Sequence, residues 1–152
     1  MSRTKKILLG VFLFLIVIQF IRPGRNINAQ VLPTDITKLY SIPENVQASL
    51  KTACYDCHSN NTRYPWYVNI QPVGWYLAWH VREGKDELNF SEFGSYTQRR
   101  KTGKLKGIAN TVRDDEMPLS SYTLIHKDAI LTNEQKAQII DWARNAASQT
   151  TP

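Results

Sequence analysis

Cysteine, histidine and methionine are scarce in this sequence. Its 152 residues include two cysteines, three histidines and two methionines, one of which is the initiator. No internal repeat, glycine-rich phosphate loop or alternation of apolar and polar residues occurs, which argues against repeat architectures, P-loop nucleotide binding and a sheet-based fold. The one run of carboxylates, residues 114–116, is better explained as a solvated turn than as an acid–base pair. These absences leave an all-α domain as the expected fold class.

An excess of charge of one sign is also lacking. The formal net charge is +6, of which Arg3, Lys5 and Lys6 supply +3, so the remainder is only mildly basic. This balance is unlike that of a nucleic-acid-binding protein, and we expect no nucleic-acid partner. Aromatic residues are numerous for a single domain, with four Trp, seven Tyr and five Phe. They suit an ordinary core or a pocket around a flat aromatic cofactor.

Both cysteines fall in one motif, Cys54-Tyr55-Asp56-Cys57-His58. Cys-x-x-Cys-His is the attachment motif of c-type haem. Residues three apart lie on one face of a helical turn, so both sulfurs can reach the vinyl groups along one haem edge. The imidazole of His58 then lies where a ring nitrogen can bind the iron from the proximal side. The motif predicts haem c bound through Cys54 and Cys57, with His58 as an iron ligand.

Three other interpretations of the cysteine pair are weaker. A structural zinc site needs four ligands, and only the three histidines could complete the set. A redox-active dithiol would need a thioredoxin-like strand and helix around it, and no such pattern is present. A chance occurrence with no cofactor is the third alternative. We favour haem.

The N-terminus has the pattern of a membrane segment. Residues 1–6 are short and positive, and residues 7–21 are apolar except for Gly10 and Gln19. Fifteen residues span only ~22 Å against a hydrocarbon core of ~30 Å, although Lys6 and Arg22 could extend the reach by snorkelling. We expect a cytoplasmic segment over 1–6, a transmembrane anchor over 7–22, a linker over 23–37 and a haem-binding domain over 38–148.

A cleaved signal peptide is the alternative to the anchor. Its best cleavage site would follow Ala29, which puts Ile27 where a small residue is needed. The positive residues before the apolar run favour a cytoplasmic N-terminus. We therefore expect a single-pass protein of the cell membrane with its domain on the periplasmic side, where c-type haem is attached.

Helical periodicity locates the elements of the domain. A helix should start near Pro43 and carry the haem motif on its last turns, with Val46, Leu50, Ala53 and Cys57 on one face. A second helix should run over 73–83 and end at Gly84. A third is expected within 97–113, although Gly103 and Gly107 weaken it. The last should begin after Thr132, whose capping box is completed by Gln135.

Met117 is the best candidate for the second axial iron ligand. It is the only internal methionine, lies 59 residues after His58 and is followed by Pro118 in a predicted loop. A buried methionine can also be simple core packing. His80, His126 and an open iron position are the alternatives. A basic cluster over 99–106 could be a solvated helix face, a docking patch for an acidic redox partner or a neighbour of the haem propionates.

The order of these motifs is similar to that of small monohaem cytochromes c. It resembles more closely the membrane-anchored haem-binding domain proteins of bacteria, over about residues 38–147. The matching pieces are residues 57–60, 64–67, 88–91, Met117-Pro118, Tyr122 and His126. The resemblance implies that the helices around Val46 and Ile140 pack together.

The expected function is electron transfer between protein redox partners by a monohaem c-type cytochrome at the extracytoplasmic membrane surface. The expected haem-binding residues are Cys54, Cys57, His58 and Met117, the last two being iron ligands. We expect no enzymatic activity. The alternative is a haem-based enzyme or sensor with an open or exchangeable distal site.

Overall fold

The structure, a computed structural model, describes residues 2–28 and 30–149. Every regular element over these residues is helical, and the only β-type pairing is an isolated bridge between Ile27 and Asn61. This confirms the all-α prediction. In chain order the elements are α1 (Arg3–Ile18), α2 (Ile36–Leu39), α3 (Glu44–Ala53), α4 (Tyr55–His58), η1 (Trp66–Asn69), α5 (Val73–Glu87), η2 (Phe93–Ser95), α6 (Gln98–Arg113), α7 (Ser120–Thr123), η3 (Lys127–Ala129) and α8 (Asn133–Gln149).

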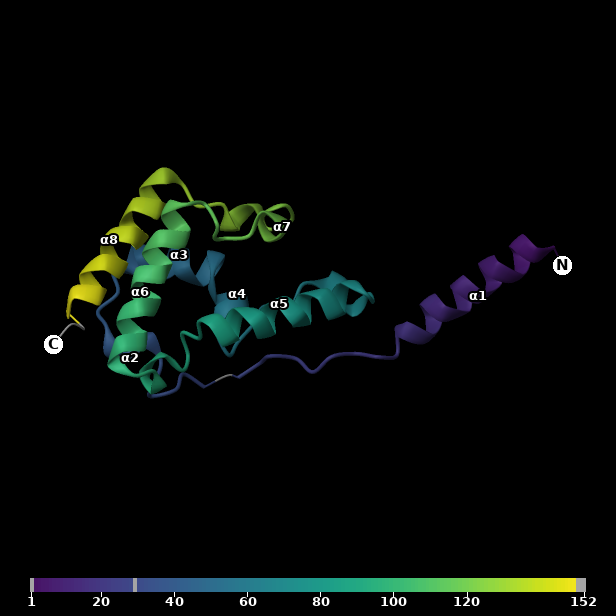
Figure 1. Ribbon diagram of the computed structural model, residues 1–152, viewed down its shortest axis with the longest axis horizontal. Helices are drawn as coiled ribbons and strands as arrows, with labels where there is room; N and C mark the ends of the chain where they lie inside the picture. The colour runs from purple at the N-terminus through teal and green to yellow at the C-terminus, as the bar shows by residue number, and fades with distance from the viewer. Residues whose placement is uncertain (1, 29, 150–152) are drawn as a thin grey trace.

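The core lies where α3, α6 and α8 meet. Figure 1 shows α6 and α8 side by side with opposite directions, and they form the most extensive helix pair of the fold. Helix α3 packs against α8, so the packing implied for the helices around Val46 and Ile140 is observed. The largest fully buried side chains are Ile36, Leu50, Phe90, Phe93, Leu105 and Ile139.

The two long helices of the core start at the capping residues that the sequence supplies. The Thr97 hydroxyl accepts a hydrogen bond from the Arg100 backbone N–H at the start of α6. At the start of α8, the backbone N–H groups of Thr132 and Gln135 each donate to the other residue's side chain, at 2.9 and 3.2 Å. This is the predicted capping box, and it satisfies two donors that a helix start otherwise leaves free.

Helix α5 is longer than the sequence predicts. It continues through Gly84 to Glu87, one turn past the expected end. The prediction was wrong because this glycine does not cap the helix. Its backbone φ is negative, and its Cα faces Cys57 in the haem motif. A glycine within a helix can mark close packing rather than an end.

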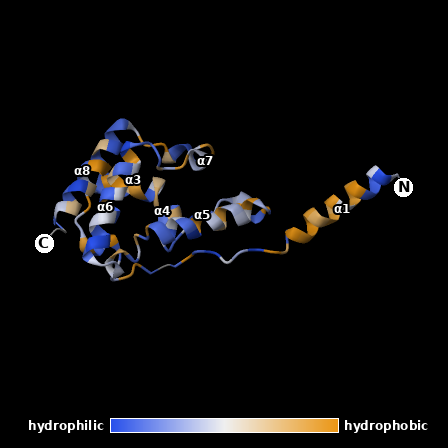
Figure 2. Cartoon of the chain, viewed as in Figure 1, coloured by the Kyte–Doolittle hydropathy of each residue, from blue (hydrophilic) through white to orange (hydrophobic). Residues whose placement is uncertain are grey.

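Helix α1 does not reach the length of the expected transmembrane anchor. It comprises 16 residues and stops at Ile18, so Gln19 to Arg22 lie outside it. At 1.5 Å per residue this gives about 24 Å, less than the ~30 Å hydrocarbon core. Over the residues described, no helix combines the length and the apolar character needed to cross a membrane. Figure 2 shows the helix apolar along most of its length, apart from its first turns.

The segment after α1 contacts the domain, so it is not a free linker. The Gln19 side chain exchanges two hydrogen bonds with the Gln71 backbone, at 2.9 and 3.2 Å, and the Trp75 indole N–H donates to the Ile21 carbonyl at 2.7 Å. Further along, Lys85 Nζ donates to Asn26 Oδ1 at 2.7 Å. In Figure 1 this segment runs alongside α5 before it reaches the core.

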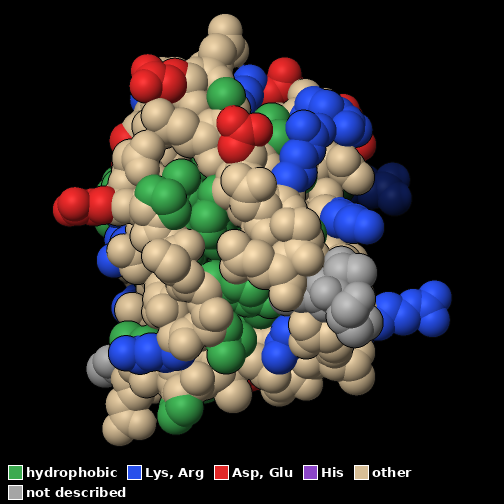
Figure 3. All heavy atoms as spheres, turned by 90° about the vertical axis from the view of Figure 1, so that its left-hand side faces the viewer, with side chains coloured by type: hydrophobic (Ala, Val, Ile, Leu, Met, Phe, Trp, Pro, Cys, Tyr) green, Lys and Arg blue, Asp and Glu red, His purple; other side chains and the backbone are tan. Residues whose placement is uncertain are grey.

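The end of the domain opposite α1 is covered by α8. Figure 3 looks onto this end and shows apolar side chains in a narrow central strip, flanked by polar and charged ones. A groove of about 430 Å³ runs between α3 and α8, where the Trp142 indole N–H donates to the Ser41 carbonyl at 3.2 Å. The cysteine motif lies on the other side of the core.

Candidate haem site

The attachment motif lies across a break between two helices. Helix α3 ends at Ala53, and Cys54 leaves helical geometry with φ −124° and ψ −39°. A separate turn, α4, then carries Cys57 and His58. The prediction of one continuous helix was therefore wrong. The turn is nevertheless tied to Cys54, because the His58 backbone N–H donates to the Cys54 carbonyl at 3.0 Å. Both cysteines and the histidine remain on one short segment.

The His58 imidazole is fixed by two backbone carbonyls. Its Nδ1 lies 2.8 Å from the Gly84 oxygen and 3.0 Å from the Leu88 oxygen. Carbonyl oxygens only accept hydrogen bonds, so Nδ1 must carry the proton and Nε2 keeps its lone pair. Burial also lowers the pKa of His58, an effect that outweighs these two hydrogen bonds, which raise it. A neutral imidazole oriented through its other nitrogen is the usual form of a metal-binding histidine.

Gly84 allows α5 to approach the motif closely enough to make this bond. A Cβ at position 84 would lie 2.8 Å from the Cys57 carbonyl oxygen and 3.1 Å from the Cys57 Cβ. Any side chain here would push α5 away from α4. Sequence reasoning missed this role, since a glycine in a helical pattern more often suggests a C-terminus.

The two cysteines are half-buried, and their thiols are neutral. Burial raises the pKa of Cys54 to about 12 and that of Cys57 to about 11, with a smaller contribution from Asp56 at Cys57. Reactive cysteines are instead favoured as thiolates by a lowered pKa. Over residues 2–28 and 30–149, no cluster of three or more His, Cys, Asp and Glu side chains is arranged to hold a metal ion. The missing ligand cluster weakens the zinc interpretation, and the raised thiol pKa values weaken the redox dithiol interpretation.

A large apolar cavity adjoins the motif. Its volume is about 610 Å³, within the usual range for a small-molecule or cofactor site. One wall comes from the motif segment and the residues that follow α5, the other from α6. The lining residues that carry the argument are Cys54, His58, Phe90, Gly103, Gly107 and Met117.

The two glycines of α6 leave room in this cavity. A Cβ added at Gly103 or at Gly107 would meet no atom within 4 Å, and both positions line the cavity. They are four apart, so they lie on one face of α6 and form a stretch of bare helix backbone. A flat ring system can approach such a surface closely. A haem group fits the cavity, its glycine wall and the neutral His58 imidazole and thiols beside it.

This fit predicts opposite effects of two substitutions at Gly107. Gly107→Trp should abolish haem incorporation, because the indole would fill the space that a haem needs. Gly107→Ala should preserve haem binding, and it should stabilise α6 by up to about 1 kcal/mol because alanine has the higher helix propensity. Haem content per protein, measured from the Soret absorbance, tests the first expectation, and urea unfolding tests the second. Full haem loading of Gly107→Trp would contradict this position for the site.

Met117, the predicted second iron ligand, lines the same cavity as His58. Its backbone N–H donates to the Thr111 carbonyl at 3.2 Å, which ties it to the end of α6. It also lines a second cavity of about 170 Å³, together with Cys57, His58 and His80. The structure therefore brings all four predicted haem-binding residues to one location: Cys54, His58 and Met117 line both cavities, and Cys57 lines the smaller one.

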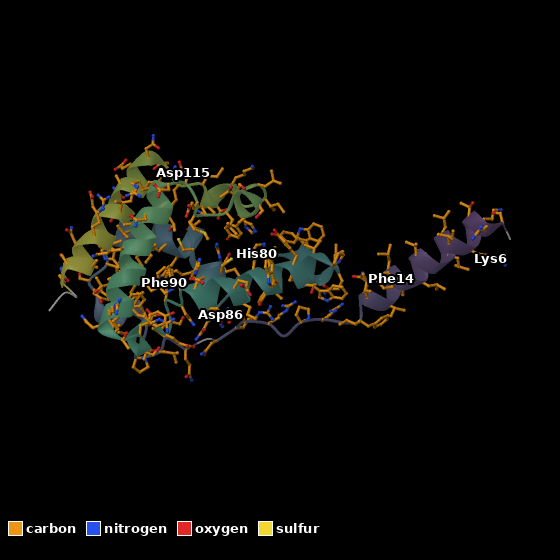
Figure 4. The ribbon with its side chains drawn as sticks, viewed as in Figure 1. Lys6, Phe14, His80, Asp86, Phe90 and Asp115 are labelled. Atoms are coloured by element: carbon orange, nitrogen blue, oxygen red, sulfur yellow. The ribbon has the colours of Figure 1, made fainter. Side chains whose placement is uncertain are left out.

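The other two histidines have different surroundings. In Figure 4, His80 lies on α5 on the side nearer to α7. Its Nε2 is buried without a hydrogen-bond partner, and its ring lies against Tyr76 and Trp79 at 4.3 and 4.7 Å. His80 is one turn before Gly84, on the same helix whose carbonyls bind His58. His126 lines neither cavity, and its Nε2 forms a 2.7 Å hydrogen bond with Tyr67 Oη.

Part of the basic cluster lies at the cavity. Arg99, Arg100 and Lys104 line it, whereas Lys101 and Lys106 do not. Lys104 is paired with Glu87 at 3.4 Å, and the Arg100 guanidinium lies over the Tyr96 ring at 5.0 Å. The cluster was predicted as a solvated face, a docking patch or a neighbour of propionates. Its placement favours the last of these, since arginine and lysine side chains bind carboxylates.

Comparison with known proteins agrees with this site. Residues 13–145 match the protein family described as haem-binding domain, and this match includes the motif segment, α5, α6 and Met117. No curated protein and no solved structure matches the chain. Since the family match spans most of the sequence, the chain belongs to the haem-binding domain family.

Proposed function

We propose that this chain is a monohaem c-type cytochrome that carries electrons between protein partners. The observation that supports it most is the position of four residues: Cys54, His58 and Met117 line a cavity of haem size, and Cys57 lines the smaller cavity that these three residues share with it. Bound haem would supply a one-electron Fe(III)/Fe(II) couple. The protein then has to hold, orient and insulate that group.

Each part of the site has a task in this proposal. Cys54 and Cys57 would form the two thioether bonds, and their neutral thiols are held within one turn. The hydrogen bonds from Nδ1 to the Gly84 and Leu88 carbonyls orient His58. They also make the Nε2 lone pair more basic, and therefore a better ligand for iron. Met117 would offer a neutral sulfur ligand, which favours the reduced state relative to a second histidine. Arg99 and Arg100 at the cavity would bind the propionate carboxylates.

An open or exchangeable distal site is the alternative, and one observation favours it. The buried Nε2 of His80 has no partner and lies beside the cavity that Met117 also lines. A haem enzyme or sensor could use such a histidine next to a vacant iron position.

Carbon monoxide separates the electron carrier from this alternative. If Met117 is a permanent ligand, the reduced wild-type protein should show no spectral change under carbon monoxide at neutral pH, and Met117→Ala should bind it readily. The Soret shift of the reduced protein measures both. Rapid binding by the wild type would contradict the carrier and support the open site.

We further propose that residues 7–21 hold the protein at the cell membrane, with the haem domain on the periplasmic side. The large apolar side chains over residues 7–17 of α1 are exposed, with exposed fractions of 42 to 63 %. Exposed apolar surface of this extent marks an interaction site. The positive residues before it favour a cytoplasmic N-terminus.

Membrane attachment predicts a specific fractionation. The full-length protein should remain in the membrane pellet after washing with alkaline carbonate, because apolar burial does not depend on ionic contacts. The substitution Phe12→Lys should weaken this retention, and Lys136→Gln, on the distant helix α8, should leave it unchanged. A mature N-terminus near Val31, found by sequencing, would show cleavage of the segment instead.

A further inference from the structure

The segment that carries Met117 has little apolar packing of its own. It runs from the end of α6 to η3 and includes α7, none of whose residues is buried. Leu124 and Ile125 are 70 and 60 % exposed. Tyr122 packs against the core, but the segment has few other apolar contacts to hold it against the domain, although an axial ligand has to be kept in place. Asp115, near its start, forms an ion pair with Lys136 on α8, and two polar contacts connect its α7 end to other parts of the chain.

The first contact reaches into the attachment motif. The Tyr122 hydroxyl donates to Asp56 Oδ2 at 2.7 Å, and Asp56 is the residue between Tyr55 and Cys57. Asp56 is only 6 % exposed, and its other oxygen accepts hydrogen bonds from the backbone N–H and Nε of Arg63, at 3.0 and 3.3 Å. A buried carboxylate needs such partners. The acceptor is therefore fixed relative to both cysteines.

The second contact lies one turn further along. The His126 ring stacks on Tyr122, with centroids 4.2 Å apart and planes 13° apart. Its Nε2 forms the hydrogen bond with Tyr67 Oη, on η1. Burial and the bond to Asp56 raise the pKa of Tyr122, so its hydroxyl stays protonated and keeps donating. We call these four residues, Asp56, Tyr67, Tyr122 and His126, the tyrosine clamp.

Tyr122, the clamp residue on α7, is five residues after Met117 in the chain. The backbone N–H groups of Tyr122 and Thr123 both donate to the Leu119 carbonyl at 3.0 Å, which makes this stretch one rigid turn. Leu119 is two residues after Met117. On its other side, Met117 is held by its own N–H at the Thr111 carbonyl. Met117 thus lies between two anchored points, the end of α6 and the clamped turn.

We propose that the tyrosine clamp is the positioning device of the axial methionine: the Tyr122–Asp56 hydrogen bond holds the Met117 segment to the turn that carries Cys54, Cys57 and His58. This inference rests on the proposed Met117 ligation. None of the clamp residues touches the iron in this proposal. They act by keeping the segment closed, so that the sulfur stays available and competing ligands are excluded.

The test is competition by imidazole in the oxidised, haem-loaded protein. An external ligand binds only when the segment opens, so its apparent affinity rises with the open fraction. A hydrogen bond to a charged group is strong enough to change that fraction about tenfold or more. Tyr122→Phe, which keeps the ring and its stacking, should bind imidazole about tenfold more tightly. It should also lose the weak far-red sulfur-to-iron(III) band at a lower temperature than the wild type.

Tyr64→Phe is the matched control. Its hydroxyl accepts a hydrogen bond from the Asn26 backbone, away from the Met117 segment, so its imidazole affinity should equal that of the wild type. Tyr67→Phe removes only the second contact and should give a smaller shift in the same direction, which keeps the test valid if Tyr122→Phe fails to load haem. Wild-type imidazole affinity in both clamp variants would overturn the clamp. Absence of the far-red band from the wild type would instead overturn the proposed Met117 ligation.

Discussion

Replacing both motif cysteines, Cys54→Ala with Cys57→Ala, is expected to abolish covalent haem completely. The wild-type protein should keep its haem on a denaturing gel and give a c-type pyridine haemochrome, because thioether bonds survive denaturation. The double variant should lose both signals, since no other cysteine exists in the chain. Haem staining of the gel and the haemochrome spectrum measure the result.

The apoprotein of the double variant should also be destabilised. In the folded state, haem adds buried apolar contacts and iron ligation, and both are lost when no haem is attached. Without haem, the cavity of about 610 Å³ beside α6 would lack its main partner. The matched control is Ser59→Ala, outside the Cys-x-x-Cys-His motif, which should retain the haem signal. Extraction of haem from the wild type by acidic butanone would show that no covalent bond exists.

Much of the fold follows from local sequence signals. The buried stripe of Leu105, Ile108 and Val112 on α6 has helical spacing, and all three are at most 7 % exposed. The capping box at Thr132 depends on residues three apart, so it too can be recognised from the sequence alone. Such features are determined by neighbours along the chain, where periodicity and capping rules apply.

The site depends on contacts that are distant in sequence, and these could not be predicted. A glycine at the end of a helical pattern, such as Gly84, usually indicates the end of the helix. Here Gly84 instead lets α5 contact Cys57, 27 positions earlier in the chain. The Asp56–Tyr122 hydrogen bond joins residues 66 apart. Asp56 is a variable position in a Cys-x-x-Cys motif, so nothing in the pattern indicates a buried carboxylate. The candidate residues Cys54, Cys57 and His58 could be recognised because haem attachment requires this spacing.

The length of α1 shows a different limit. An apolar run reveals a tendency to be buried, but it does not locate the end of the helix. Just after the end of α1, the Gln19 side chain bonds to the Gln71 backbone, and the Trp75 indole N–H donates to the Ile21 carbonyl. The predicted span of 7–22 ignored these contacts. The chain therefore contacts α5 already at Ile21, within the span that hydropathy assigns to the membrane.

Substitution of Met117 is expected to have the second large effect, on the iron itself. Oxidised wild-type protein should show the far-red band of sulfur coordination to iron(III), and Met117→Ala should remove it. The reduction potential should fall by roughly 100 mV or more, because axial-ligand identity sets haem potentials over a range of about 0.8 V. Optical spectroscopy and protein-film voltammetry measure the two effects.

Two further variants identify the ligand. Met117→His should keep a six-coordinate iron with the band gone, because an imidazole replaces the thioether. His80→Ala should leave the band in place. His80 on α5 and Met117 on the segment after α6 line the same smaller cavity, so the two variants are compared directly. If the wild type lacks the band and His80→Ala alone opens the iron to carbon monoxide, His80 is the ligand and Met117 is not.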